Sequence, residues 1–245
     1  MKHFVPVFAF CVFSVMPTYS VEHATLGENL HEATIPLIEL HSNASTAKIC
    51  SYQLQHFDFH YKPETANPAI IMLGNSMVRS TDWVKLLERD DVINRGIAGD
   101  KIKCICERTK YLKGKGAKIW IIEGGINDLP AMKTSEILKQ FDLIVDFVKS
   151  ENAIPVIVSP TFVSPRAKLK LKKDVTKTNL AVADINQKLI RYCDSTKTDL
   201  INLNMKLSEN GALVEKYTTD GVHFTDEAKL IWAKEILSLL KKHKI

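Results

Sequence analysis

The sequence lacks the compositional extremes that mark collagens, low-complexity chains and wholly disordered proteins. It has only 10 Gly and 9 Pro among 245 residues, and its 45% hydrophobic and 25% charged residues can build one sizeable core. It also lacks a strong excess of charge. Its 33 basic and 28 acidic residues leave a net charge of +5, too small by itself to indicate nucleic-acid binding. No internal repeat or linker divides the chain.

Long apolar runs are also missing after the first residues, so no later segment reaches the roughly 20 apolar residues that span a membrane. The one long apolar run lies at the start of the chain, from Phe4 to Met16. It follows the positive charge of Lys2 and is followed by small residues before Val21. This order is typical of a secretory signal peptide. We therefore predict a signal peptide at residues 1–20 and export to the periplasm or the medium. The alternative is an uncleaved amphipathic or membrane anchor.

Cysteine is sparse, and removal of the signal peptide leaves Cys50, Cys104, Cys106 and Cys193. An even number permits disulfides in an oxidising compartment, with three possible connectivities. Buried free thiols are an equally good interpretation, because a chain of this size needs no covalent staples. The Cys104-Ile105-Cys106 spacing is not that of a zinc finger, and no matching pair with histidines follows it. We therefore expect no metal site.

Short apolar runs alternate with amphipathic stretches from residue 69 onward. Continuous β-branched runs predict buried parallel strands at 70–73, 92–93, 119–122, 154–158 and 200–201. Helical spacing places two sets of residues each on one face: Ile137, Phe141, Ile144 and Val148, and then Val182, Ile185, Leu189 and Tyr192. A last helix is predicted with Thr225 as its N-cap and with the stripe Leu230, Ala233, Leu237 and Leu240.

This alternation predicts an α/β fold, a three-layer α/β/α sandwich around a mostly parallel five-stranded sheet. Residues 21–68 show no periodicity and are predicted to be an irregular N-terminal extension, which leaves 69–245 as one domain. Sheets of this kind bind ligands beyond the carboxyl ends of their strands. Four polar segments are therefore candidates for a ligand-binding site: Gly74-Asn75-Ser76-Met77, the run from Asn94 to Asp100, the run from Gly124 to Asp128, and Asp220-Gly221-Val222-His223.

The chemistry of these segments suits a serine nucleophile. A hydroxyl such as that of Ser76 attacks an ester only when a base removes its proton, and the base needs an orienting carboxylate. His223 and Asp220 can supply these two groups. The oxyanion then needs donors, and the amides of Ser76 and Gly99 and the side chain of Asn127 can provide three. Taken alone, each segment is also ordinary turn chemistry, and Ser76 alone suits a helix N-cap.

The four segments together resemble the blocks of the SGNH or GDSL hydrolase family, in the family's order and over about 175 residues from Ile70 to the last helix. The resemblance implies a flavodoxin-like fold, with Ser76 as nucleophile, His223 as base and Asp220 as its partner. It also implies Ser76, Gly99 and Asn127 as the oxyanion hole. One residue departs from the family pattern: Asn75 stands where the GDSL box usually has Asp. We expect this change to be tolerated.

The function that these residues imply is ester hydrolysis by an acyl-enzyme route. The expected substrates are small-molecule, glycan or lipid esters: short acyl or acetyl groups on sugars, or lysophospholipids. No cofactor, nucleic acid or lasting membrane span is expected. Two alternatives use the same residues, acyl transfer to a glycan acceptor and non-catalytic binding of carbohydrate or lipid. A basic run that begins at Arg166 and Lys168 and ends at Lys173 follows the fourth strand, and it is either a solvated face or an attraction for anionic substrates.

Overall fold

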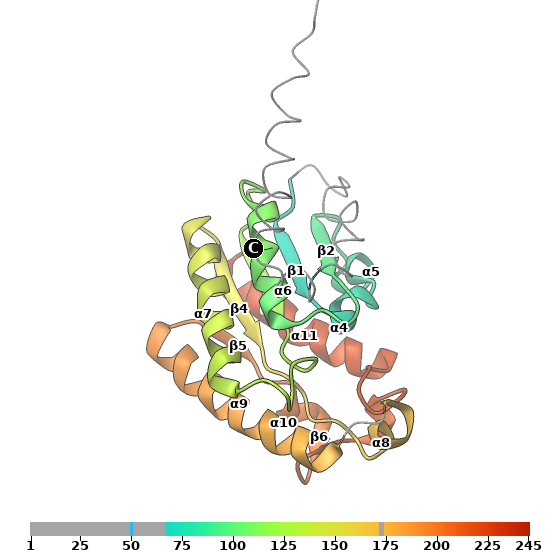
Figure 1. Ribbon diagram of the computed structural model, residues 1–245. Coiled ribbons are helices and arrows are strands. Elements are labelled where there is room, and N and C mark those ends of the chain that lie inside the picture. The colour runs from blue at the N-terminus through green and yellow to red at the C-terminus, as the bar shows by residue number, and fades with distance from the viewer. Residues whose placement is uncertain (1–49, 51–66, 172–173) are drawn as a thin grey trace, which may run out of the picture. The chain divides into compact units, whose positions relative to one another are not determined.

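The computed structural model describes residue 50 and residues 67–171 and 174–245 (Figure 1). The predicted signal peptide, and all of the predicted extension 21–68 except residues 50, 67 and 68, therefore lie outside the described residues. Within the described part of the chain, no helix has the length and apolar character needed to cross a bilayer.

Five strands form one sheet in which every neighbouring pair is parallel. They are β1 (Ile70–Gly74), β2 (Val92–Gly96), β3 (Ile119–Glu123), β4 (Ile154–Val158) and β5 (Asp199–Ile201). Their order across the sheet, β2-β1-β3-β4-β5, is that of flavodoxin-like folds and confirms the predicted fold class. The order changes direction between β1 and β3, so the ends of these two strands meet at the crevice where such folds bind ligands.

Helices cover both faces of the sheet (Figure 1). One face is covered by α6 (Ile102–Glu107), α7 (Thr134–Ser150) and α9 (Val175–Thr196), and the other by α5 (Trp83–Leu87) and α11 (Asp226–His243). The shorter elements are α4 (Ser76–Arg79), η1 (Thr109–Leu112), α8 (Arg166–Leu171), α10 (Asn204–Leu207), the hairpin β6 (Ser208–Glu209) and β7 (Ala212–Leu213), and η2 (Glu215–Tyr217).

Side-chain alternation along the strands divides the core into two layers. In β1, Ile71 and Leu73 join the layer under α6, α7 and α9, whereas Ile70 and Met72 join the layer under α5 and α11. All of these residues are fully buried, which explains why the strands read as continuous apolar runs.

The predicted faces of α7 and α9 are largely confirmed. The four predicted residues of α7 are buried, as are Val182, Ile185 and Leu189 of α9, while Tyr192 is partly buried against the same layer.

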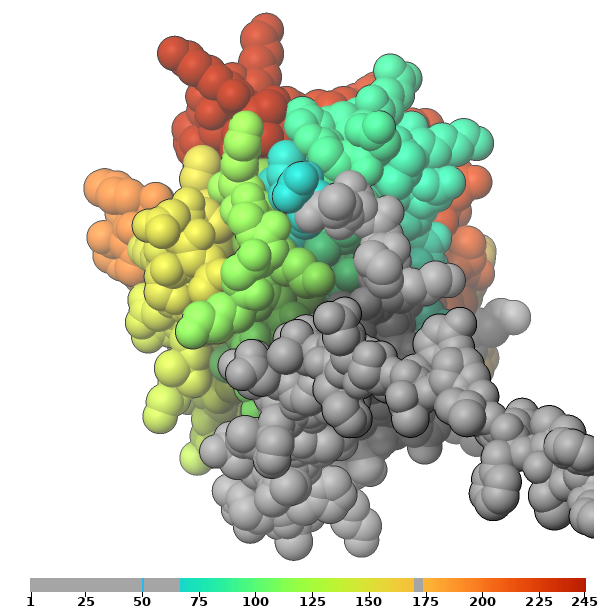
Figure 2. Space-filling model, turned by 90° about the horizontal axis from the view of Figure 1, so that it is seen from above, coloured from blue at the N-terminus to red at the C-terminus, as the bar shows by residue number. Residues whose placement is uncertain are grey.

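The predicted stripe of the last helix was partly wrong. Leu230 and Leu237 are 48% and 40% exposed, and α11 instead buries Trp232 and Ile236 together with the expected Ala233 and Leu240. Trp232 decides the rotation of the helix because its large ring packs edge-on against Trp83, with centroids 4.7 Å apart. Figure 2 shows the C-terminal residues, in red, beside the teal segment around α5 and β2.

Thr225 stands at the predicted N-cap position of α11 but its side chain makes no capping hydrogen bond. Its hydroxyl donates instead to the carbonyl of Lys216 at 3.2 Å.

Strand β2 extends three residues beyond the predicted 92–93. Asn94, Arg95 and Gly96 continue the parallel ladder opposite Met72, Leu73 and Gly74 of β1, so they belong to the strand rather than to the loop that follows it. The extension requires glycine at 96. A Cβ at that position would lie 2.3 Å from the amide nitrogen of Arg79, where β2 passes the end of α4.

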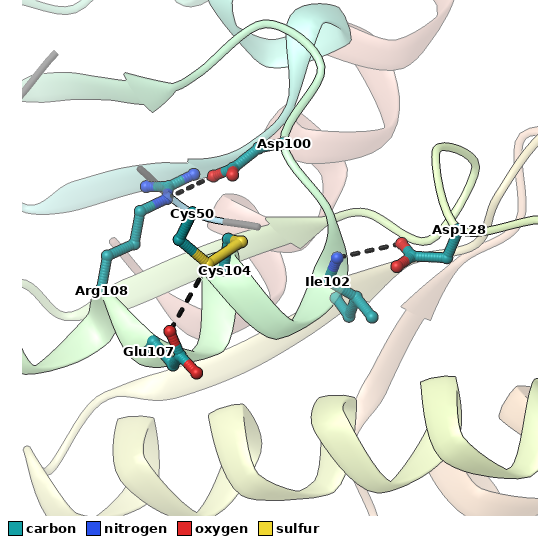
Figure 3. The surroundings of a disulfide bond; sticks show 7 residues. All are labelled: Cys50, Asp100, Ile102, Cys104, Glu107, Arg108 and Asp128. Atoms are coloured by element: carbon teal, nitrogen blue, oxygen red, sulfur yellow. Dashed lines mark hydrogen bonds and ion pairs between the residues drawn. A yellow bond between two sulfur atoms is a disulfide. The ribbon is translucent and has the colours of Figure 1, made fainter. Parts of the chain in front are cut away.

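A disulfide joins Cys50 to Cys104 on α6, with a Cα–Cα distance of 5.7 Å (Figure 3). This is one of the pairings that the sequence left open. Cys106 and Cys193 are free thiols, and burial raises their pKa to about 11 and about 12, respectively. Both thiols are therefore protonated and unreactive near neutral pH.

Candidate active site

Ser76 begins α4, directly after the turn that ends β1. The turn is fixed by Asn75, whose side-chain oxygen accepts a hydrogen bond from the Met77 amide at 2.9 Å. Asn75 is fully buried, whereas Ser76 is partly exposed. The serine hydroxyl therefore stands at the carboxyl end of the sheet, on a backbone that a buried side chain holds in place.

His223 and Asp220 complete a chain of polar contacts with Ser76. Ser76 Oγ lies 3.0 Å from His223 Nε2, and His223 Nδ1 lies 2.6 Å from Asp220 Oδ2. An ionised carboxylate only accepts hydrogen bonds, so Nδ1 carries the ring proton and Nε2 is left to accept from the serine hydroxyl. This is the tautomer that a general base for Ser76 requires.

The charge of Asp220 is stabilised by its hydrogen bonds. Burial opposes its ionisation, but bonds from the amide and ring of His223 and from the amide of Val222 outweigh this effect and lower the pKa of Asp220. The carboxylate is therefore present at neutral pH to orient the imidazole.

The loop that carries His223 is packed closely against α8. Gly221 has a φ of +100°, and a Cβ at that position would lie 2.1 Å from the amide nitrogen of Ala167. The Gly221 carbonyl accepts from the amide of Ser164 at 2.9 Å. Glycine is therefore required here, both for the backbone conformation and for the approach of the helix.

The expected oxyanion donors stand on the neighbouring loops. Gly99 lies after β2 with a φ of +75° and has open space around its Cα. Among the described residues, the backbone amides of Ser76 and Gly99 donate to no acceptor. Asn127 follows β3, and its amide nitrogen donates to the carbonyl of Asp100 at 2.9 Å. A primary amide has two N–H bonds, so this contact orients Asn127 and leaves one N–H for a ligand.

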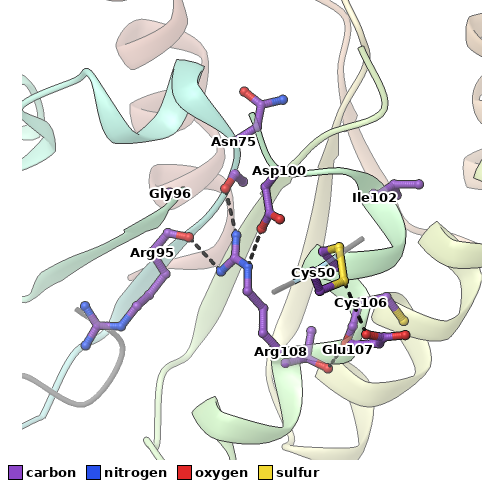
Figure 4. A network of polar contacts seen from close by, with 12 residues as sticks. Cys50, Asn75, Arg95, Gly96, Asp100, Ile102, Cys106, Glu107 and Arg108 are labelled. Carbon is purple, nitrogen blue, oxygen red and sulfur yellow. Dashed lines mark hydrogen bonds and ion pairs between the residues drawn. A yellow bond between two sulfur atoms is a disulfide. The ribbon is translucent and has the colours of Figure 1, made fainter. Parts of the chain in front are cut away.

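Arg108 is a buried site residue that the sequence analysis missed (Figure 4). Its guanidinium donates to the carbonyl of Gly74 at 2.7 Å, to the carbonyl of Arg95 at 2.9 Å and to the carboxylate of Asp100 at 2.7 Å. It therefore connects the end of β1, the end of β2 and the loop whose carbonyl holds Asn127. Nothing in the sequence distinguishes this arginine from a surface charge, because its partners are up to 34 residues away.

Asp128 anchors α6 at its other end. Its carboxylate accepts from the amide of Ile102, the first residue of that helix, at 2.9 Å (Figure 3). A negative charge at a helix N-terminus is favourable both as a hydrogen-bond acceptor and against the helix dipole. The loop from 99 to 101 is thus held between β2 and a fixed helix.

The basic run after β4 divides into different roles. Arg166 pairs with Glu215 at 3.1 Å and lies 3.5 Å and 3.4 Å from the carbonyls of Thr218 and Thr219, so it supports the loop before Asp220. Lys168 is exposed, and Lys172 and Lys173 lie outside the described residues. Among the residues that the structure describes, no three His, Cys, Asp or Glu side chains gather into a metal site.

Comparison with known protein families identifies the family of this chain. Residues 73–229 match the model of the GDSL-like Lipase/Acylhydrolase family. The chain belongs to the GDSL-like lipase/acylhydrolase family. The matched span begins just before the turn at Ser76 and ends after His223, so it includes every residue of the candidate site.

Solved structures share the fold. A GDSL-like lipase from Bacteroides thetaiotaomicron superposes with a TM-score of 0.66 at 20% identity, over 80% of this chain and 99% of its own. An aryl esterase from M. smegmatis gives 0.56 at 14% identity, over 72% and 99% of the two chains. The acetyl xylan esterase AlAXEase gives 0.54 at 18% identity, over 70% and 98%. No curated protein matches the sequence.

In this GDSL-like lipase/acylhydrolase, Asn75 stands where the box usually has Asp, and it bonds to a buried glutamate. The side-chain nitrogen of Asn75 donates to Glu123 Oε1 at 2.9 Å, and its backbone nitrogen donates to Glu123 Oε2 at 3.2 Å. Glu123 ends β3 and is buried. Its place at the end of an apolar run gives no sequence signal that marks it as part of the site.

Proposed function

We propose that this chain is an exported serine esterase that cleaves carboxylic esters through Ser76, His223 and Asp220. The observation that carries the proposal is the continuous chain of contacts of 3.0 Å and 2.6 Å from Ser76 Oγ through the imidazole to Asp220. Its order of groups is that of a nucleophile, a base and an orienting carboxylate. Membership of the family supports the same reaction class.

The proposed reaction has two half-reactions. Ser76 Oγ attacks the ester carbonyl while His223 Nε2 takes the hydroxyl proton, and the C–O bond to the alcohol breaks as the imidazolium returns that proton to the leaving oxygen. Water then attacks the acyl-enzyme, with His223 again taking and returning the proton. The amides of Ser76 and Gly99 and the side chain of Asn127 stabilise the oxyanion, where a single donor is commonly worth about 3 kcal/mol.

The proposed substrates are esters of short acyl groups, such as acetyl groups on saccharides, with lysophospholipids as the second class. The His223 side chain is 36% exposed, so water reaches the base directly, which favours hydrolysis over transfer to a second alcohol. Two solved structures of similar fold are named an aryl esterase and an acetyl xylan esterase, so aryl esters and acetylated sugars are the first compounds to test.

Export is supported by the disulfide, since disulfides persist in oxidising compartments.

The test uses purified protein and p-nitrophenyl esters from acetyl to decanoyl, acetylated xylo-oligosaccharides and a lysophospholipid. We expect turnover that is fastest for the shortest acyl groups, covalent labelling of Ser76 by a fluorophosphonate, and loss of both in Ser76→Ala. Ser80→Ala, four residues further along and exposed, is the matched control and should retain activity. An unlabelled Ser76 together with no turnover of any ester would contradict the proposal, and label on another serine would relocate the nucleophile.

A further inference from the structure

The carboxyl of Glu123 lies directly behind the nucleophile turn. It is 5% exposed, and both of its oxygens accept hydrogen bonds from Asn75, one from the backbone amide and one from the side-chain amide. The proposed chemistry makes no use of this carboxyl. A buried carboxylate is costly unless it is hydrogen-bonded, so the pairing with Asn75 is what allows this residue to be tolerated here.

Asn75 transmits this anchoring to Ser76. Its side-chain nitrogen donates to Glu123, while its side-chain oxygen accepts from the amide of Met77. Ser76 is the residue between these two anchored positions. Three hydrogen bonds therefore fix the backbone on either side of the nucleophile, and two of the three end on Glu123.

The chemistry of the pair explains why asparagine is present. The bond at 2.9 Å needs a donor on residue 75, and an ionised aspartate has none. Two carboxylates at that distance in a buried site would repel each other and could not both ionise. Burial also raises the pKa of Glu123 to about 7, although its two bonds from Asn75 oppose this shift.

No opposite charge on the described residues bonds to the Glu123 carboxyl. Glu123 also lines a small cavity, and the other described residues that line it are uncharged: Met77, Val158, Ser159, Thr161, Leu203, Phe224 and Trp232. Two ionisable groups of the candidate site bond to other partners. Arg108 binds the Gly74 carbonyl and Asp100, and His223 binds Ser76 and Asp220. Asn75 is thus the principal polar partner of the carboxyl.

We propose that Glu123 is a positioning residue that holds Ser76 in its attacking geometry through Asn75, and that the asparagine is matched to this buried carboxylate. The inference rests on the proposed function, because it takes Ser76 as the nucleophile. It makes the pair interchangeable in one way only. With aspartate at 75 and glutamine at 123, the glutamine amide donates to the aspartate, while its oxygen accepts from the residue 75 amide and the aspartate still accepts from Met77.

The experiment compares wild type with Asn75→Asp, Glu123→Gln and the double variant Asn75→Asp/Glu123→Gln. Rates with p-nitrophenyl acetate are divided by the amount of enzyme that a fluorophosphonate labels, so that unfolded protein is not counted. The ratio of each variant's kcat to that of wild type is measured from about pH 7.5 to pH 9.5. Burial raises the pKa of Glu123 to about 7, so the wild-type carboxyl is mostly ionised throughout this range.

We expect the ratio for Asn75→Asp to fall by about tenfold or more as pH rises, because the single proton shared by the two carboxyls is lost. We expect the double variant to be within about threefold of wild type across this range, since it restores every hydrogen bond. Glu123→Gln alone should lose activity without that pH dependence. The NH₂ group of the glutamine cannot accept a hydrogen bond, so one of the two donors of Asn75 loses its acceptor. The matched control is Asn210→Asp/Glu209→Gln, the same exchange at exposed positions of the β6–β7 turn, and it should leave kcat unchanged.

The outcomes separate this inference from the proposed function. A wild-type protein that neither turns over esters nor reacts with the fluorophosphonate overturns both. If the wild type is active, two results would overturn only the role of Glu123. One is a constant kcat ratio for Asn75→Asp over the pH range, and the other is a double variant no more active than Asn75→Asp at about pH 9. A merely structural pair would change the thermal stability but not the pH dependence of kcat per labelled enzyme.

Discussion

At the scale of single residues, Asp220 performs two tasks with its two oxygens. Oδ1 accepts from the amides of Val222 and His223, both at 2.9 Å, and so shapes the loop, whereas Oδ2 accepts from the imidazole at 2.6 Å. The loop geometry needs only an acceptor, which an amide oxygen also provides. The tautomer of His223 needs an acceptor at the second position, which only the carboxylate provides.

The substitution Asp220→Asn should therefore preserve the fold and impair catalysis. Its Oδ1 can still accept the two amides, but its NH₂ group then faces His223 Nδ1 and favours the tautomer with the proton on Nε2, which cannot accept from Ser76. By analogy with serine proteases we expect kcat to fall about 10³- to 10⁴-fold. The measurement is kcat with p-nitrophenyl acetate, alongside thermal unfolding.

The matched control for this change is Asp226→Asn, on the 95% exposed carboxylate at the start of α11. It should keep wild-type kcat. Activity of Asp220→Asn close to that of wild type would show that the imidazole is oriented by other means.

At the scale of secondary-structure elements, Arg108 connects α6 to the ends of β1 and β2. Its side chain is 7% exposed, the Asp100 side chain is fully buried, and the ion pair between them measures 2.7 Å. Burial lowers the pKa of Arg108, and the neighbouring Asp100 opposes this shift. Removal of one member of such a pair leaves the other charge buried without its partner, which is the costly case for ion pairs.

We therefore expect Arg108→Met to lower the free energy of unfolding by about 3–5 kcal/mol, measured by urea denaturation. Arg108→Lys should recover only part of this loss, because one ammonium group cannot reproduce three directed guanidinium contacts. Arg89→Met breaks the partly exposed pair with Asp91 and should cost less than about 1 kcal/mol. Equal losses for the two methionine variants would contradict a structural role for the buried network.

The same comparison of elements shows what the sequence could predict. Strands buried on both faces are largely continuous apolar runs, so β1, β3, β4 and β5 were predicted to within one residue at each end. Strand β2 was predicted three residues too short, because its second half is Asn94-Arg95-Gly96. The four polar segments were recognised by their order along the chain. Helix α11 was partly misassigned because two alternative apolar stripes have helical spacing, and only the packing of Trp232 against Trp83 selects one. Glu123 and Arg108 were missed because their burial depends on how strands distant in sequence lie side by side.

At the scale of the whole molecule, a disulfide links Cys50 to Cys104 on α6, the helix that borders the candidate site. Cys50 and Cys104 are separated by 54 positions in sequence, and Cys104 lies on α6 between the contacts of Ile102 and Arg108 (Figures 3 and 4). The Glu107 carboxylate lies 3.5 Å from the Cys50 sulfur, and its pKa is raised chiefly by burial. The disulfide thus helps to hold α6, the helix that follows the loop 99–101 with the proposed oxyanion donor Gly99.

Loss of this bond should destabilise the protein through the unfolded state. For a closed loop of this length the chain-entropy model gives about 4 kcal/mol, with native-state strain as the term that can reduce it. We expect Cys50→Ala/Cys104→Ala to lower the free energy of unfolding by about 2–4 kcal/mol, and dithiothreitol to lower that of wild type by a similar amount while leaving the double variant unaffected. Cys106→Ala removes a thiol from the same helix without touching the bond, so its unfolding should respond to the reductant as wild type does.

Because the site loops lie at one end of α6, the reduced protein should also lose activity at a lower urea concentration than the oxidised protein. Identical unfolding curves with and without reductant would show that the bond contributes nothing to the stability of the site.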